Sequence, residues 1–425
     1  MERKFIGWNF IENAHKTFLL TLIILIPFCA SSIFMKTFKC DCKDHQILFF
    51  ESSTCIACER VVGLDDNFDN VEPYDLDETI GQYFKAAEPD VRYQKCDNHA
   101  NYKTCTGMVN LNTFVPVEGE DEVLCFACRF NETIPDLSIV EHIPLWKKME
   151  VAKRRALYTL KSMKLPLETI AQNPDSGLSF DFTTDRDVND HFASTLKNQE
   201  AVFTGHDCGH ITINLAEADE VARSHTKLAM GEKYRTLLGH FRHELGHYYF
   251  DKLIAGSPQK HALCKQYFGD DELSYKDAMD KHYKDGAPEN WRDSYISEYA
   301  TMHAYEDWAE TWSHYMHIMD TLETAKNFSI TGSTIGNAEE TEEVEDLTLP
   351  QDAYFFSAQT SITNILDTWT DFAIILNSLN RSMGMSDAYP FVLTQPVRTK
   401  LAFIHHAIHD RLNRMPNLMV ETENS

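Results

Sequence analysis

Two histidines and a glutamate within five residues carry the clearest chemical signal in this chain, in His243-Glu244-Leu245-Gly246-His247. Apolar and aromatic residues recur around them at helical spacing, and no proline interrupts residues 237–253. Histidines four residues apart lie on one face of a helix, so both imidazoles can bind one metal ion, with Glu244 beside them to accept a proton from water. The alternative is a core helix whose histidines are only hydrogen-bonded.

A third ligand is expected from a second helix. A metzincin continuation of the motif would need Gly and His at positions 250 and 253, where the chain has Phe250 and Leu253. The other common arrangement takes a glutamate from a later helix, and Glu306 and Glu310 stand four residues apart in a helical pattern. We expect Glu306 on the metal and Glu310 hydrogen-bonded to a ligand histidine, because bare carboxylates at this spacing repel. An acidic surface stripe is the alternative.

The cysteines predict two further metal sites. Eight of the eleven lie between residues 40 and 128, in two sets of four: Cys40, Cys42, Cys55 and Cys58, then Cys96, Cys105, Cys125 and Cys128. Two thiolate pairs separated by a loop are what a tetrahedral structural zinc needs. The close spacing favours zinc over the alternative, the disulfide framework of a secreted protein. Cys29, Cys208 and Cys264 are left over and expected to be unpaired.

Length and charge bound the class of protein. At 425 residues, 43% of them hydrophobic, the chain has room for two or three domains with at least one substantial core. Its formal net charge of −26 argues against a nucleic-acid backbone or an anionic membrane surface as partner.

The first 34 residues form an apolar extension. Thr17 to Met35 carries no charge and could be a signal peptide, a marginal membrane span or an upstream translated segment. Thiolate zinc sites directly after it suit a reducing compartment. We therefore expect the ordered protein to begin near Met35 in the cytoplasm, with membrane attachment only if residues 17–35 are retained as an anchor.

The remaining chain divides into two predicted parts, an α+β organisation. Residues 35–135 form a double zinc-ribbon module, with strands at 46–50 and 108–111 and an acidic loop at 64–78. Residues 136–425 form a mainly helical domain with a small sheet. Its helices are predicted at 139–164, 217–230, 237–253, 273–284, 295–320 and 354–408, with breaks at 389–390 and 395–396. Its strands are predicted at 179–182 and 210–215, and an acidic loop at 327–352. The strand at 210–215 is either an internal strand or an edge strand that holds an extended peptide.

With these motifs in place, the chain resembles a bacterial family of zinc-binding metallopeptidases that carry a zinc-ribbon module ahead of the catalytic domain. The resemblance runs from Met35 to His409 and rests on the segments 35–42, 131–138, 211–219, 234–249, 306–312 and 376–384. Residues 1–34 and 339–346 depart from the family pattern. The paired motifs are also similar to the gluzincin arrangement of lethal-factor-like toxins, in which a tyrosine seven residues before the glutamate ligand assists catalysis. Tyr299 stands at that position here; an ordinary helix aromatic is the alternative.

The sequence thus predicts a zinc-dependent peptidase with a zincin-like domain. His243, His247 and Glu306 are expected to hold one catalytic zinc, Glu244 to act as general base, and Tyr299 to donate a hydrogen bond to the oxyanion.

Supporting residues and partners follow from this reading. Glu310 and Asp251 would orient the ligand histidines. Two structural zinc ions would occupy the ribbons, which offer a surface for a protein partner, and the substrate would be a peptide or protein. One alternative is a zinc-ribbon adaptor with an inactive peptidase-like domain. Another is a zinc hydrolase of non-peptide amides.

Overall fold

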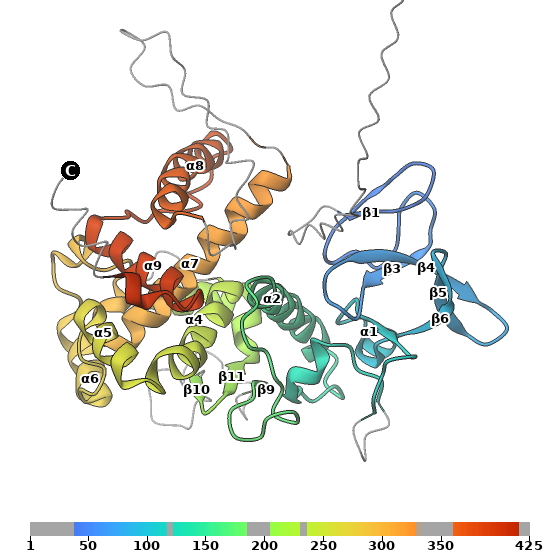
Figure 1. The fold of residues 1–425 in the computed structure, drawn as a ribbon, viewed down its shortest axis with the longest axis horizontal. Helices are drawn as coiled ribbons and strands as arrows, with labels where there is room; N and C mark the ends of the chain where they lie inside the picture. The colour runs from blue at the N-terminus through green and yellow to red at the C-terminus, as the bar shows by residue number, and fades with distance from the viewer. Residues whose placement is uncertain are drawn as a thin grey trace, which may run out of the picture. The chain divides into compact units, whose positions relative to one another are not determined.

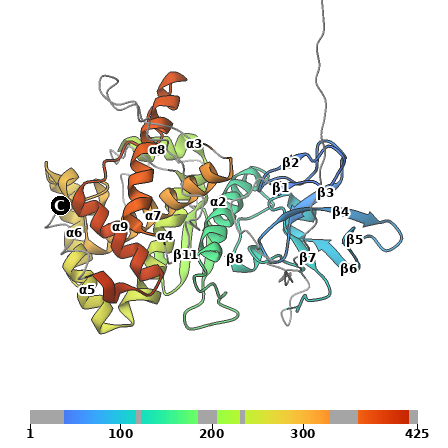
Figure 2. The ribbon, with the colours of Figure 1, turned by 45° about the horizontal axis from the view of Figure 1, so that its top comes forward.

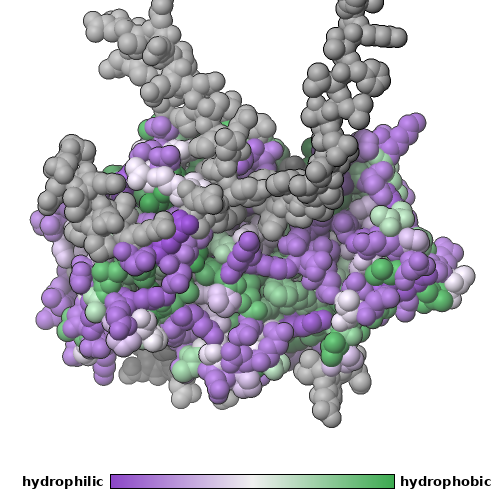
Figure 3. Space-filling model, in the orientation of Figure 1, coloured by the Kyte–Doolittle hydropathy of each residue, from purple (hydrophilic) through white to green (hydrophobic). Residues whose placement is uncertain are grey.

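A computed structural model describes residues 38–116, 122–184, 205–229, 236–328, 330 and 360–415 (Figure 1). The apolar extension 1–34 and nearly all of the acidic loop predicted at 327–352 lie outside these residues. What is described has an N-terminal region of short strands and cysteine clusters, followed by a mainly helical domain with a small sheet. This α+β architecture confirms the predicted fold class. The face shown in Figure 3 is largely hydrophilic, in keeping with the net charge.

The N-terminal strands form two antiparallel sheets. One pairs β1 (Phe38–Lys39) with β2 (Ile47–Leu48). The other is a five-stranded meander of β3 (Val61–Leu64), β4 (Val71–Asp77), β5 (Gln82–Lys85), β6 (Glu88–Lys95) and β7 (Met108–Asn110). The loop predicted at 64–78 was wrong in its second half, where β4 lies, and residues 65–70 form the turn between β3 and β4. Buried Val71 and Tyr74 anchor that strand to the core, and Glu72 pairs with Lys85 of β5 at 3.1 Å, so the acidic residues lie on a paired strand.

The second region contains a four-stranded sheet in the order β10 (Gly205–Asp207), β11 (His210–Asn214), β9 (Ser179–Thr183), β8 (Asn131–Thr133). The strands predicted at 179–182 and 210–215 are therefore confirmed. β11 is not an edge strand, since the tight hairpin before it places β10 on one side while β9 pairs in parallel on the other. β8 falls inside the predicted interval 35–135 and yet pairs with β9.

Nine α-helices lie in the described part of the chain: α1 (Asp97–Tyr102), α2 (His142–Ser162), α3 (Glu220–Ala229), α4 (Leu237–Phe250), α5 (Pro258–Phe268), α6 (Tyr275–Asp285), α7 (Ala304–Asn327), α8 (Ile362–Ser382) and α9 (Gln395–Ile408). Each of the predicted helical regions overlaps at least one of them, and α7 continues seven residues beyond the predicted end at 320. In Figures 1 and 2, α4 and α7 lie side by side within the helical domain.

Two of the differences from the predicted helix boundaries have a clear local cause. The helix expected from 295 begins only at Ala304, because the side chain of His303 caps it by accepting a hydrogen bond from the Tyr305 amide. Tyr299 therefore lies in a 3₁₀ turn (Tyr299–Thr301) ahead of α7. Pro396 does not break the C-terminal helix, since it stands in the first turn of α9, where a proline costs no hydrogen bond.

The packing of α4 against α7 fixes the candidate ligands. Gly246 lets the helices approach closely, and its carbonyl accepts a hydrogen bond from the Trp308 indole at 2.8 Å. Further along, Arg242 of α4 forms a buried ion pair with Asp320 of α7. At the other end of α7, Lys400 of α9 binds Asp307 at 2.6 Å, which holds the first turn of the helix.

Gly246→Val is expected to lower the free energy of unfolding by about 1–3 kcal/mol, the range for overpacked cores. A Cβ atom at position 246 would lie 3.0 Å from the Cα atom of Ala309, a backbone atom that can move only if the helices separate. Gly256→Val is the matched control, because its Cβ atom would meet nothing within 4 Å. Urea unfolding of both variants checks this, and equal midpoints would contradict the account of the helix contact.

Candidate metal centre

One candidate centre lies where the middle of α4 meets the first turn of α7. His243 and His247 project from α4 and Glu306 from α7, all three are buried, and their ligand atoms lie within 4.8 Å of one another. The His243 Nε2 atom is 3.2 Å from His247 Nε2 and 2.9 Å from Glu306 Oε2. The His247 Nε2 atom is 3.4 Å from Glu306 Oε1. The structure thus brings together the three residues that the sequence selected as ligands.

These separations fit a zinc ion. Zinc binds histidine nitrogen and carboxylate oxygen at about 2.0–2.1 Å, so tetrahedral ligand atoms lie about 3.3 Å from one another. The three observed distances, 2.9, 3.2 and 3.4 Å, surround that value. Burial alone would raise the pKa of Glu306, but the facing His247 and His243 hold that pKa well below its ordinary value. An ionised carboxylate facing two imidazoles is the donor set that a divalent metal requires.

Glu310 holds the far side of His243. Its Oε1 atom lies 2.7 Å from His243 Nδ1, while its Oε2 atom accepts a hydrogen bond from the Ser297 hydroxyl at 2.6 Å. Burial would raise the pKa of Glu310, yet the hydrogen bond and charge of His243 lower that pKa to about 2. An ionised Glu310 keeps the Nδ1 proton of His243 in place and leaves Nε2 for the metal.

Asp251 does not hold His247 in the same way. Among the described residues, no hydrogen bond joins the two, and the buried Nδ1 atom of His247 has no partner. The Asp251 side chain is 52% exposed and lies 3.9 Å from His206 Nδ1. Asp251 begins a π-helical turn (Asp251–Ala255), where the four-residue repeat that motivated the prediction no longer applies. The ring of Tyr305, stacked on His247 with centroids 4.1 Å apart, orients this ligand instead.

Glu244 lies buried beside the ligands and is itself held by His240. The Oε1 atom of Glu244 is 3.3 Å from His240 Nε2, and His240 Nδ1 is 3.5 Å from Glu217 Oε2. Burial raises the pKa of Glu244, but His240 and the neighbouring histidines outweigh it and lower that pKa below its ordinary value. His240 could have been found from the sequence, since it stands four residues before Glu244. The Glu217 contact had no sequence signal.

Two tyrosines approach the centre. The ring of Tyr299 lies 5.9 Å from that of His243, between centroids. Tyr275, from the start of α6, donates a hydrogen bond from its hydroxyl to Glu306 Oε1 at 3.0 Å. Sequence reasoning missed Tyr275, because 31 residues and two 3₁₀ turns separate it from the ligand it contacts.

Both cysteine sets also converge. In each set of four, the sulfur atoms lie within 4.8 Å of one another, and the four of the second set are all buried. The 3.7 Å between Cys40 Sγ and Cys58 Sγ matches the separation of about 3.8 Å expected for thiolates bound to one tetrahedral zinc. Arg60 donates to both of these sulfurs at 3.5 Å, which stabilises thiolates. All ten cysteines in the described residues are free, so these residues form no disulfide framework.

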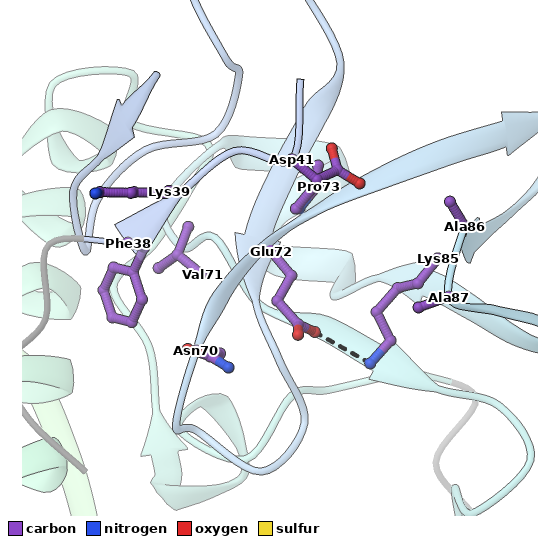
Figure 4. A pocket seen from close by; sticks show the side chains of 10 residues that line it. All are labelled: Phe38, Lys39, Asp41, Asn70, Val71, Glu72, Pro73, Lys85, Ala86 and Ala87. Carbon is purple, nitrogen blue, oxygen red and sulfur yellow. Dashed lines mark hydrogen bonds and ion pairs between the residues drawn. The ribbon is translucent and has the colours of Figure 1, made fainter. Parts of the chain in front are cut away.

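A hollow of about 440 Å³ in the N-terminal region shares no residue with any of these clusters (Figure 4). The charged groups on its wall are largely satisfied, since Lys85 forms ion pairs with Glu72 at 3.1 Å and Glu88 at 3.0 Å. Its lining therefore offers no chemistry comparable to that of the metal centre.

The comparisons with known proteins agree with this geometry. A family model described as "Putative zinc-binding metallo-peptidase" matches residues 142–407, and a zinc-ribbon domain model matches residues 37–139. The chain belongs to this metallopeptidase family. Membership confirms the family that the sequence motifs resemble. The metallopeptidase model spans α2 to α9 and includes His243, His247 and Glu306.

Relatives of this chain occur in mycobacteria. An uncharacterized protein of Mycobacterium bovis and one of Mycobacterium tuberculosis are each 36% identical over 380 residues, covering 88% of this chain and 96% of the relative. No solved structure matches the chain. None of the helices in the described part of the chain is long and apolar enough to cross a membrane.

Proposed function

We propose that the chain is a zinc-dependent peptidase that hydrolyses peptide bonds with Glu244 as general base. The observation that carries this proposal is the convergence of His243, His247 and Glu306, at separations that fit one zinc ion, beside the ionised Glu244. A purely structural site would not need such a carboxylate next to its ligands. When bound, zinc would act as a Lewis acid that polarises the scissile carbonyl and lowers the pKa of water to about 7.

The chain's own residues perform the remaining steps. Glu244, fixed by His240, accepts the proton of the attacking water and passes it to the leaving amine. Tyr299 donates a hydrogen bond to the oxyanion, a contact worth several kcal/mol where it operates. Glu310 keeps His243 in the tautomer that presents Nε2 to the metal.

A peptide fits this site better than a small amide. β10 pairs only with β11, so within the described part of the chain no strand occupies its other edge, which an extended peptide could use. β10 also lies near α4, which carries the two histidines. Main-chain hydrogen bonds to such an edge give affinity for peptides without selecting one side chain. We therefore assign to β10 the peptide-binding edge that the sequence analysis considered for residues 210–215.

The ribbons have a separate proposed role. Two structural zinc ions would stabilise the module of residues 35–135, and the catalytic domain would begin at residue 136. β8 belongs to the module by sequence but pairs with β9 in the sheet of the catalytic domain. Ile56, between Cys55 and Cys58, is 82% exposed and offers an apolar contact for a protein partner. Free thiols suit a cytoplasmic location.

The test compares wild type with Glu244→Gln on a peptide library and on a panel of small amides, each with zinc present and after chelation. Zinc-dependent cleavage of peptides by the wild type alone would support the proposal. Cleavage of small amides alone would favour the non-peptide hydrolase. No turnover by a wild type that holds all its zinc would favour the adaptor.

A further inference from the structure

Helix α6 approaches the metal centre although it contributes nothing to the core. None of its eleven residues is buried. Its first residue nevertheless reaches the site, where the Tyr275 hydroxyl donates to Glu306 Oε1 at 3.0 Å. A helix without buried residues gains little from packing. The contact with Glu306 is therefore a feature of the site that hydrophobic packing of α6 does not explain.

His303 fixes the position of Tyr275 relative to Glu306 by contacting the starts of both helices. Its Nδ1 atom accepts a hydrogen bond from the Tyr305 amide at 3.2 Å and so caps α7. Glu306 is the next residue of that helix after Tyr305. Its Nε2 atom lies 3.1 Å from the Leu273 carbonyl, just ahead of α6. The ring of Tyr275 packs on the His303 ring with centroids 5.4 Å apart. One neutral imidazole thus fixes the starts of both helices, since Nδ1 accepts and Nε2–H donates.

The two oxygens of Glu306 have different surroundings. Oε2 lies 2.9 Å from His243 Nε2, whereas Oε1 lies 3.4 Å from His247 Nε2 and accepts the Tyr275 hydroxyl. A hydrogen bond to one oxygen favours coordination through the other and leaves a position open for water, as a catalytic zinc site needs. The ring of Tyr299, by contrast, lies beside the His243 ligand, with centroids 5.9 Å apart. Of the two, Tyr275 is the tyrosine that bonds directly to a ligand carboxylate.

We propose that Tyr275 is the positioning residue of the Glu306 ligand: its hydroxyl holds one carboxylate oxygen so that the other binds the metal. The proposal rests on the metal centre proposed above. It assigns the two tyrosines separable roles, because Tyr275 acts on the affinity for zinc through Glu306, whereas Tyr299 acts on the reaction.

The experiment compares full-length Tyr275→Phe, Tyr299→Phe and Tyr102→Phe with wild type. Zinc affinity of the histidine–glutamate centre is measured by competition with a chelator. Tyr275→Phe is expected to weaken zinc binding about 10–100-fold, the usual effect of losing a partner of a ligand. Tyr299→Phe should weaken it much less than Tyr275→Phe does, because Tyr299 forms no hydrogen bond to a ligand among the described residues. Tyr102→Phe, which makes the same change at a 38% exposed position outside the site, is the control and should bind zinc as wild type does.

Activity adds a second readout. Saturating zinc should restore peptide turnover by Tyr275→Phe, but not by Tyr299→Phe. The metal-free Tyr275→Phe chain should unfold at the wild-type temperature, because the substitution removes only a hydroxyl from a helix without buried residues. Wild-type zinc affinity in Tyr275→Phe, or a larger loss in Tyr299→Phe, would overturn this inference alone. A wild type that binds no third zinc would overturn the metal centre as well.

Discussion

Glu244→Gln is expected to lower kcat about 10²–10⁴-fold, the contribution of a general base, while the zinc content stays unchanged. The substitution keeps the size of the side chain and its hydrogen bond from His240, but it removes the group that accepts the proton. Glu244 is not among the three residues whose ligand atoms converge, so the metal should remain bound. Initial rates on a cleaved peptide, with elemental analysis of the same samples, measure both quantities.

The control for this variant is Glu289→Gln, which makes the same change at an exposed position outside the site. It should keep wild-type kcat. Retained turnover in Glu244→Gln would show that another residue takes the proton. Loss of zinc from this variant would mean that the Glu244 carboxylate serves as a metal ligand rather than as the general base.

Cys125→Ser is expected to remove one zinc ion and to destabilise the second ribbon by several kcal/mol. Structural zinc contributes about 10–16 kcal/mol of binding free energy in zinc-finger peptides, which is an upper bound for a module with other contacts. Cys125 is buried, and a Cβ atom on Gly107 would lie 2.5 Å from its sulfur, so little space exists for a rearranged site. The loss should spread to α2, since Cys128 lies 3.9 Å from Glu150 of that helix.

Elemental analysis and limited proteolysis of the 35–135 region measure this effect. Cys208→Ser is the control, because Cys208 is exposed and belongs to neither cluster, and it should keep both zinc content and protease resistance. An unchanged zinc content in Cys125→Ser would contradict the assignment of the second set.

The candidate ligands were predictable because their signals are local. The helical period around His243 and His247, the spacing of Glu306 and Glu310, and the paired cysteines survive in any fold that forms these elements. Their convergence depends on the contact between α4 and α7, where Gly246 and Trp308 meet.

The supporting residues were less accessible from the sequence. Tyr275 reaches Glu306 only because His303 joins the starts of α6 and α7. Asp251 was misjudged because the helix changes to a π turn at that residue. β4 was mistaken for a loop because its acidic residues concealed the buried positions between them. In each case the observed structure depends on a tertiary contact or on a local change of backbone conformation. Neither can be predicted from composition alone.

The most direct test of the central claim is the number of zinc ions per chain, by elemental analysis, in wild type and in the His243→Ala/His247→Ala double variant. The account predicts about three ions falling to two, since two cysteine clusters and one histidine–glutamate centre each hold one. Two ions in both proteins would contradict it, because the helix pair would then hold no metal and the case for a zinc peptidase would fall.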